Sequence, residues 1–201
     1  MKNPSIAFVL MASSLVGCGE MPDGADDEGV TEETSALGTL PAYPTKFKLK
    51  NYQTGLCLGV AAGTPNTGTA LVTWPCDNSA NQTWIQTSKI SGDRSAVHLQ
   101  NSVAYNRCMT LKGASYSAGT NGAPGIIDVC QDPWTLSETY GWKPISAGTD
   151  NTGHACYRFQ REGSTKVIGV SGGKTAWGTP AILWDDFNSL SGHPDQFWCV
   201  Y

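Results

Sequence analysis

The sequence repeats one pattern three times, and this repetition is the strongest limit on the fold. Each copy begins with two large apolar residues two positions apart, at Phe47 and Leu49, Val97 and Leu99, and Tyr157 and Phe159. A compact apolar motif follows ten or eleven residues later, at residues 57–60, 108–111 and 167–170. Each copy closes on a tryptophan, and Trp84, Trp142 and Trp198 are 58 and 56 residues apart. Such a period predicts repeated units that share one core.

The segments inside each copy are short and favour strands. Gly, Pro, Asn and Asp separate them, and no stretch combines a sustained helical period with helix caps. One copy cannot bury its own apolar face, whereas three copies together can close a small barrel that leaves no free sheet edge. We therefore predict an all-β domain in which the three closing tryptophans lie in the core.

Two segments carry a specific resemblance. Residues 81–84 (NQTW) and 195–198 (DQFW) resemble the Q-x-W signature of ricin-type β-trefoil lectin domains, and residues 57–84 resemble that family's repeat almost element by element. The middle copy ends in TYGW at residues 139–142, without the glutamine. The resemblance covers residues 45–201. It implies a β-trefoil of three pseudo-repeats of four strands, at about 45–92, 93–150 and 151–201, and a carbohydrate partner.

The resemblance also implies disulfides. The chain has seven cysteines, and without Cys18 six remain, whose pairing the residues alone leave open. By the family pattern Cys57 pairs with Cys76 and Cys108 with Cys130 at equivalent positions, and Cys156 and Cys199 then join the first and last strands of the third copy. No C-x-x-C pair is present, so neither a metal site nor a redox cofactor is expected.

The N-terminal region has the features of a targeting signal followed by a tether. Lys2 precedes a short apolar run at residues 6–16, and the run ends in LVGC at residues 15–18, which looks like a bacterial lipobox. We expect residues 1–17 to be a signal peptide and Cys18 to carry lipid. Residues 18–44 are acidic and poor in large apolar side chains, which predicts a flexible tether. The expected location is the bacterial cell envelope, lipid-anchored and facing the periplasm or the exterior.

Charge is divided unequally along the chain. Seven of the seventeen acidic residues lie between residues 19 and 44, which contain no Lys or Arg. The remainder is close to neutral and has no dense basic stripe, so a nucleic-acid partner is not expected. Contact with a membrane is expected through the lipid anchor only.

The sugar sites that the resemblance implies are incomplete. Matching residues are Trp74, Asn81 and Gln82 in the first copy and Trp184, Asp195 and Gln196 in the third. The family's Asp position holds Gly59, Thr110 and Gly169, and its third-strand Gln position holds Val72, Ile126 and Ile182. In one hypothesis a shallow site survives on Trp74 or Trp184, with the carboxylate supplied by Asp77, Asp185 or Asp186. In the other, Gln82 and Gln196 only bond backbone and both tryptophans pack.

Two further functions compete with sugar binding. One is a protein-interaction or adhesion module on the same scaffold, which a purely apolar surround of Trp74 or Trp184 would favour. The other is a glycosidase with Asp185, Asp186 or Asp195 as its acid pair, but adjacent strand residues point to opposite faces. The G-x-S-x-G match at residues 169–173 lacks the strand–turn–helix context of a nucleophile. The chain is expected not to be an enzyme.

Overall fold

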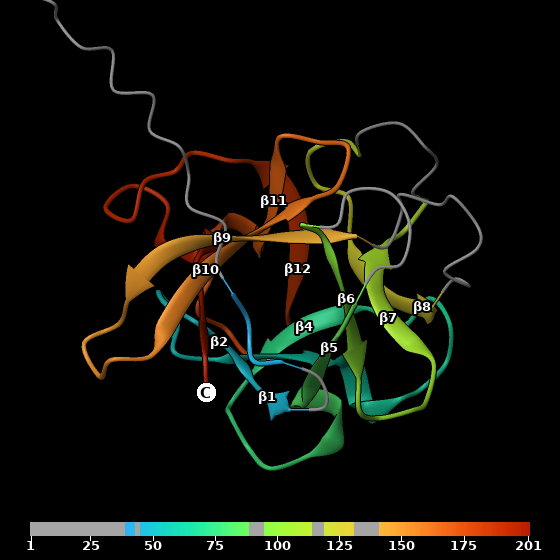
Figure 1. Cartoon of the computed structure of the whole chain (residues 1–201). Coiled ribbons are helices and arrows are strands. Elements are labelled where there is room, and N and C mark those ends of the chain that lie inside the picture. The colour runs from blue at the N-terminus through green and yellow to red at the C-terminus, as the bar shows by residue number, and fades with distance from the viewer. Residues whose placement is uncertain (1–38, 43–44, 89–94, 114–118, 131–140) are drawn as a thin grey trace, which may run out of the picture. The chain divides into compact units, whose positions relative to one another are not determined.

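The computed structural model describes residues 39–42, 45–88, 95–113, 119–130 and 141–201 (Figure 1). The predicted signal peptide, Cys18 and most of the predicted tether lie outside the described residues. The first copy contains β1 (Lys46–Phe47), β2 (Leu49–Asn51), β3 (Cys57–Val60), β4 (Leu71–Trp74) and β5 (Trp84–Ser88). The second contains β6 (Val97–Asn101), β7 (Arg107–Leu111), β8 (Gly125–Val129) and β9 (Trp142–Thr149). The third contains β10 (Ala155–Arg161), β11 (Lys166–Val170), β12 (Thr179–Asp185) and β13 (Trp198–Val200).

The first and last strands of the copies form a closed ring. β1 pairs with β5, β5 with β6, β6 with β9, β9 with β10, β10 with β13, and β13 with β2, all antiparallel. Only Lys48 separates β1 from β2, so these two short strands act as one and the ring closes. A closed ring leaves no open edge for pairing with another chain.

The middle strands of each copy form three hairpins that cover one end of the ring. β3 pairs with β4, β7 with β8, and β11 with β12. Backbone pairs join the hairpins to one another, at Thr179 with Thr73, Ala70 with Ile126, and Pro124 with Ile182. Each hairpin therefore contacts both others, which is the arrangement of a β-trefoil, and the predicted fold class is confirmed.

The three closing tryptophans occupy equivalent places in the core. All three are fully buried. The indole N–H of Trp84 donates to the Leu58 carbonyl, that of Trp142 to the Met109 carbonyl, and that of Trp198 to the Ile168 carbonyl, each at 3.0 Å. A buried indole needs such an acceptor, and here every copy supplies it from the same position of its second strand. The predicted core role of these residues is confirmed.

The three copies place side chains of different size at their shared axis. Leu71, Gly125 and Ala181 hold equivalent positions, opposite Val60, Leu111 and Val170 in the three hairpins. A Cβ on Gly125 would lie 3.1 Å from Ile168 Cδ1 and 3.3 Å from Leu71 Cδ1. A large side chain from one copy therefore uses space that a glycine in the next copy leaves open, so the core is only approximately symmetric.

Three disulfides lie within the copies. They join Cys57 to Cys76, Cys108 to Cys130, and Cys156 to Cys199, which are the pairs that the family pattern implies. The domain also begins earlier than the predicted boundary at residue 45. Leu40 is buried in the core, and the Tyr157 hydroxyl donates to the Thr39 carbonyl at 2.7 Å. Thr39 and Leu40 thus pack on the domain, although the sequence predicted a flexible tether at these residues.

Candidate functional site

Two exposed tryptophans lie at equivalent strand ends. Trp74 ends β4 opposite Cys57, and Trp184 lies at the end of β12 opposite Val167. Their side chains are 46% and 40% exposed, so neither is a core residue. The second copy has Asp128 at this position, opposite Cys108. At this strand position, an indole face is therefore available in the first and third copies, and a carboxylate stands there in the second.

In the third copy, Trp184 lines an open pocket of about 580 Å³ together with Asp195 and Gln196. The turn formed by η4 (Ser171–Gly173) also lines the pocket, as do η5 (Pro194–Gln196) and His193, which precedes η5. The structure thus brings together all three third-copy residues that the family pattern selects. An aromatic face beside a carboxylate can hold the apolar side of a sugar ring and bind its hydroxyls.

Asp195 stands close to the place where the family pattern has its carboxylate. Its Oδ2 lies 3.2 Å from the position that a Cβ would take on Gly169, the residue at the family's Asp position. The Asp195 side chain is 17% exposed, and its Oδ1 lies 3.9 Å from His193 Nδ1. Burial raises the pKa of this carboxyl above its usual value. A carboxylate from η5 thus lies close to the place where the family pattern has one on β11, over a glycine that leaves room for it.

The two glutamines of the Q-x-W signature position the backbone. Gln196 Oε1 accepts from the Phe187 amide at 3.2 Å, and its Nε2 donates to the Asp185 carbonyl at 2.6 Å. Gln82 accepts from the Asp77 amide at 2.9 Å and donates to the Pro75 carbonyl at 2.8 Å. Both side chains are buried. Each ties the segment after the third strand to the segment just before the fourth, which is the structural role that the second hypothesis assigns to them.

The three acids suggested as substitute carboxylates have other partners. Asp185 bonds Lys166 and Asn121, and these groups hold its pKa below the usual value. Asp186 pairs with Arg158. Asp77 bonds Ser79, which lowers the pKa of that carboxyl. None of the three is among the residues that line the third-copy pocket, where Asp195 is the acid.

In the first copy, the residues around Trp74 and Gly59 differ from those around Trp184 and Gly169 in the third. Asn81 in η2 (Ala80–Gln82) donates to the Val60 carbonyl at 3.2 Å, and its Nδ2 lies 3.5 Å from the Cβ position of Gly59. An amide therefore takes the place that Asp195 takes in the third copy. Trp74 packs against Trp177, with ring centroids 5.7 Å apart. Trp177 was not among the residues selected from the sequence.

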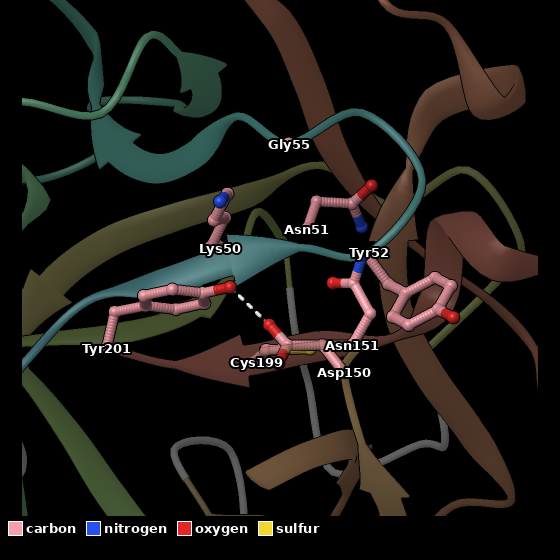
Figure 2. A pocket seen from close by; sticks show the side chains of 8 residues that line it. All are labelled: Lys50, Asn51, Tyr52, Gly55, Asp150, Asn151, Cys199 and Tyr201. Atoms are coloured by element: carbon pink, nitrogen blue, oxygen red, sulfur yellow. Dashed lines mark hydrogen bonds between the residues drawn. The ribbon is translucent and has the colours of Figure 1, made fainter. Parts of the chain in front are cut away.

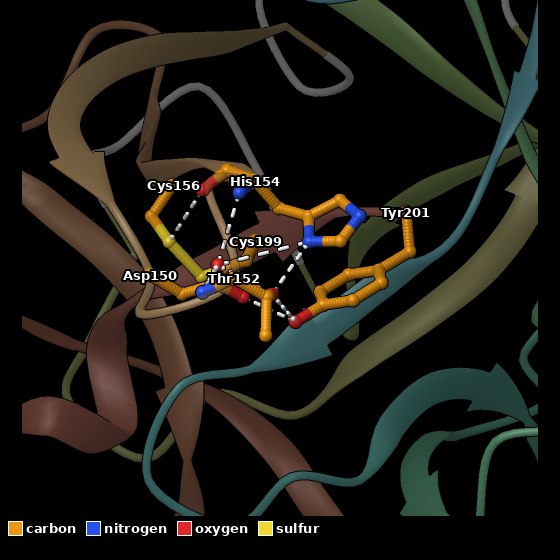
Figure 3. Close-up of polar contacts among 6 residues, drawn as sticks. All are labelled: Asp150, Thr152, His154, Cys156, Cys199 and Tyr201. Atoms are coloured by element: carbon orange, nitrogen blue, oxygen red, sulfur yellow. Dashed lines mark hydrogen bonds and ion pairs between the residues drawn. A yellow bond between two sulfur atoms is a disulfide. The ribbon is translucent and has the colours of Figure 1, made fainter.

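The sequence reasoning also missed a second pocket, lined by Lys50, Tyr52, Asp150 and Tyr201 among others (Figure 2). The Asp150 carboxylate accepts from the Tyr201 hydroxyl, from the Thr152 amide and hydroxyl, and from the His154 amide (Figure 3). These donors hold its pKa well below the usual value, with the Tyr201 bond as the largest cause. His154 stacks on Tyr201 at 3.7 Å between centroids. The carboxylate fixes the β9–β10 turn to Tyr201, the residue that follows β13.

Within the described ranges, no group of three or more His, Cys, Asp or Glu side chains is arranged to hold a metal ion. No helix among the described residues has the length and apolar content needed to cross a membrane.

Part of the chain matches a known protein family, and its fold is similar to that of several solved structures. Residues 39–127 match a family model described as ricin-type beta-trefoil lectin domain-like. No curated protein matches the chain. Among solved structures, the designed threefold-symmetric protein ThreeFoil is 20% identical, with a TM-score of 0.60 over 77% of this chain and 96% of that chain.

Two natural proteins are also similar. The ricin B-like lectin of Macrolepiota procera, solved in complex with lactose, is 15% identical, with a TM-score of 0.57 over 81% of this chain and 98% of that chain. An exo-beta-1,3-galactanase from Clostridium thermocellum is 22% identical, with a TM-score of 0.63 over 78% of this chain but only 30% of that chain. At these identities the likeness concerns the fold.

Proposed function

We propose that this chain, which carries a ricin-type β-trefoil lectin-like domain, binds carbohydrate and does not catalyse a reaction on it. The observation that carries the proposal is the third-copy pocket, in which Trp184 and Asp195 line one cavity. A flat aromatic face suits the C–H surface of a sugar ring. A carboxylate accepts hydrogen bonds from hydroxyl groups, and bonds to a charged acceptor are the stronger ones.

The surround of Trp184 favours sugar binding over a protein-interaction module. An apolar surround would suit a protein partner, whereas this pocket contains a shielded carboxylate and the His193 ring. The similar Macrolepiota procera lectin was solved with lactose, which supports a sugar as the class of ligand.

The same pocket supports a non-catalytic role. Hydrolysis of a glycoside usually needs two carboxyl groups that flank the bond. Asp195 is the one carboxylate among the residues that line the pocket. The neighbouring acids Asp185 and Asp186 bond Lys166 and Arg158, which holds them in ion pairs.

We also propose that the domain is held at a bacterial cell envelope through lipid on Cys18, facing the periplasm or the exterior. The support is the LVGC motif after a short apolar run and the acidic segment that follows it. Many tethered copies would bind a polysaccharide with high avidity even if each site is weak, because linked sites gain effective concentration.

The test is a glycan array probed with the purified protein and with Asp195→Asn. The wild type is expected to bind at least one glycan. Asp195→Asn is expected to weaken that binding about tenfold, because a charged acceptor is replaced by a neutral one at a cost of roughly 1–2 kcal/mol. Absence of binding to every glycan by a folded wild type would move the assignment to a protein-interaction module.

The same variant has an expected effect on stability that separates site from scaffold. Burial raises the folded-state pKa of Asp195, so ionising this carboxyl costs stability, and the cost appears as the pH rises through the raised pKa. Asp195→Asn removes that cost. It should therefore be at least as stable as the wild type at pH 7, and its advantage should disappear below the unfolded pKa of about 3.9. Denaturant unfolding at both pH values measures this, and a less stable variant at pH 7 would show that the carboxylate serves the fold.

A further inference from the structure

The exposed indole pair Trp74–Trp177 is built from two different copies. Trp74 ends β4 of the first copy, and Trp177 lies in the turn before β12 of the third copy. Trp177 is 65% exposed, and the two rings are tilted by 52°. Exposed tryptophans in contact with each other leave a large apolar area in water, which marks a binding surface more often than a structural one.

A hydrogen-bonded turn holds Trp177 in place. Thr179 N donates to the Ala176 carbonyl at 3.3 Å and its hydroxyl donates there at 2.6 Å, so Trp177 occupies the second position of a four-residue turn. Gly178 follows with φ of 78°, a conformation that glycine adopts without strain. The Gly178 amide donates across to the Thr73 carbonyl at 2.8 Å, next to Trp74.

The other copies have the same turn at the same place. Residues 66–69 and 120–123 each close with a hydrogen bond of 3.1 Å, and their third-position glycines, Gly68 and Gly122, have φ of 84° and 85°. The Gly68 amide donates to the Ile127 carbonyl and the Gly122 amide to the Leu183 carbonyl, each at 2.8 Å. The turn of each copy therefore binds to the third strand of the next copy around the axis.

What differs between the turns is the residue in the second position, which is Thr67, Asn121 or Trp177. Asn121 reaches the neighbouring copy and donates to Asp185 at 2.7 Å, one residue beyond Trp184. Trp177 reaches Trp74 in the same way. In these two turns the second-position residue thus reaches the strand end of the neighbouring copy, and of the three turns the one at 176–179 brings an aromatic ring.

We propose that Trp74 and Trp177 form a two-ring platform that binds two consecutive residues of an oligosaccharide. The inference rests on the proposed sugar-binding function and assigns a ligand class to the first copy. The centroid separation of 5.7 Å is close to the length of one sugar residue in an extended chain, so each exposed ring can take one residue. The tilt between the rings suits a chain whose consecutive residues are turned relative to each other. Such a site would bind a longer oligosaccharide more tightly than a single sugar residue.

The experiment isolates the first copy in a Trp184→Ala background. Calorimetry would measure binding of mono-, di-, tri- and tetrasaccharides of galactose, glucose, mannose, xylose and N-acetylglucosamine. We expect at least one disaccharide to bind about tenfold more tightly than its monosaccharide, because a second aromatic contact contributes roughly 1–1.5 kcal/mol. Adding Trp177→Asn should remove this gain and leave monosaccharide binding within about twofold.

Asparagine is the matched replacement because Asn121 occupies the same turn position in the second copy. Trp177→Thr is the second variant, because Thr67 occupies that position in the first copy. Unchanged melting temperatures show that the turn is intact. Equal affinity for all chain lengths, a chain-length gain that survives both variants, or loss of all binding in Trp184→Ala would each overturn the two-ring platform while the third-copy site stands. A wild type that binds no glycan at all would overturn the proposed function and the platform together.

Discussion

Replacing Trp142 with alanine is expected to lower the free energy of unfolding by about 3–5 kcal/mol, as for other large aromatic truncations in cores. Trp142 is fully buried where β9 meets both β6 and β10, opposite Val97 and Arg161. Its loss leaves a cavity between two copies and removes the donor to the Met109 carbonyl. Since small domains are stable by only about 5–15 kcal/mol, a large part of the total would be lost.

Trp177→Ala is the control for this experiment, because it makes the same chemical change at a side chain that is largely exposed. Its effect on stability should stay within roughly 0.5 kcal/mol. Denaturant titration of both variants measures the difference. Similar losses for the two substitutions would contradict the view that the closing tryptophans, and not the exposed ones, hold the copies together.

Replacing Trp184 with alanine is expected to weaken sugar binding by the third copy about thirtyfold or more, since aromatic residues at binding hot spots contribute roughly 2 kcal/mol or more. Trp184 is the only aromatic ring besides His193 among the residues lining that pocket. Its own side chain lies at the surface, so the melting temperature should change little. Calorimetry with a ligand identified on the array gives the affinity, and thermal unfolding gives the stability.

Asp128→Ala is the matched control, because Asp128 holds the position of Trp184 in the second copy. It should leave sugar binding unchanged. If Trp184→Ala keeps full affinity while Asp195→Asn loses it, the carboxylate binds the ligand without the indole. If Trp184→Ala melts several degrees lower, the ring is part of the packing, and its effect on binding would be indirect.

The threefold fold could be predicted because its signal lies in spacing. Trp84, Trp142 and Trp198 recur at nearly constant intervals, and a residue that recurs in this way has the same neighbours in each copy. The family pattern also implied the three cysteine pairs present in the structure. Core positions are set by periodicity, which is why sequence alone locates them well.

The chemistry of the sites was less accessible from sequence. Comparing single positions with the family pattern showed Gly169 as a loss, although the carboxylate of Asp195 fills the space above it. That exchange involves residues 26 positions apart and becomes visible only when both lie in one pocket. The sequence did contain a signal for Trp177: residues 66–69, 120–123 and 176–179 all place glycine third, and tryptophan is the exception at the second position.

The Asp150 cluster could not be found in this way because it has no counterpart in the repeat. Its partners, Thr152, His154 and Tyr201, come from one hairpin turn and from the end of the chain. Periodicity carries no information about contacts that occur in a single copy. Such contacts depend on how the ring closes between β10, β13 and β2.

The turns that bind to the next copy have a consequence for how such chains can diverge. The exposed indoles of the first and third copies each have a turn residue from the preceding copy beside them, Trp177 next to Trp74 and Asn121 next to the end of β12. A surface built on either indole therefore takes residues from two copies. Swapping one copy between two chains would change two binding surfaces at once. A point substitution at residue 67, 121 or 177 would alter one surface alone. Ligand preference in this architecture should therefore evolve through turn residues more readily than through exchange of whole copies.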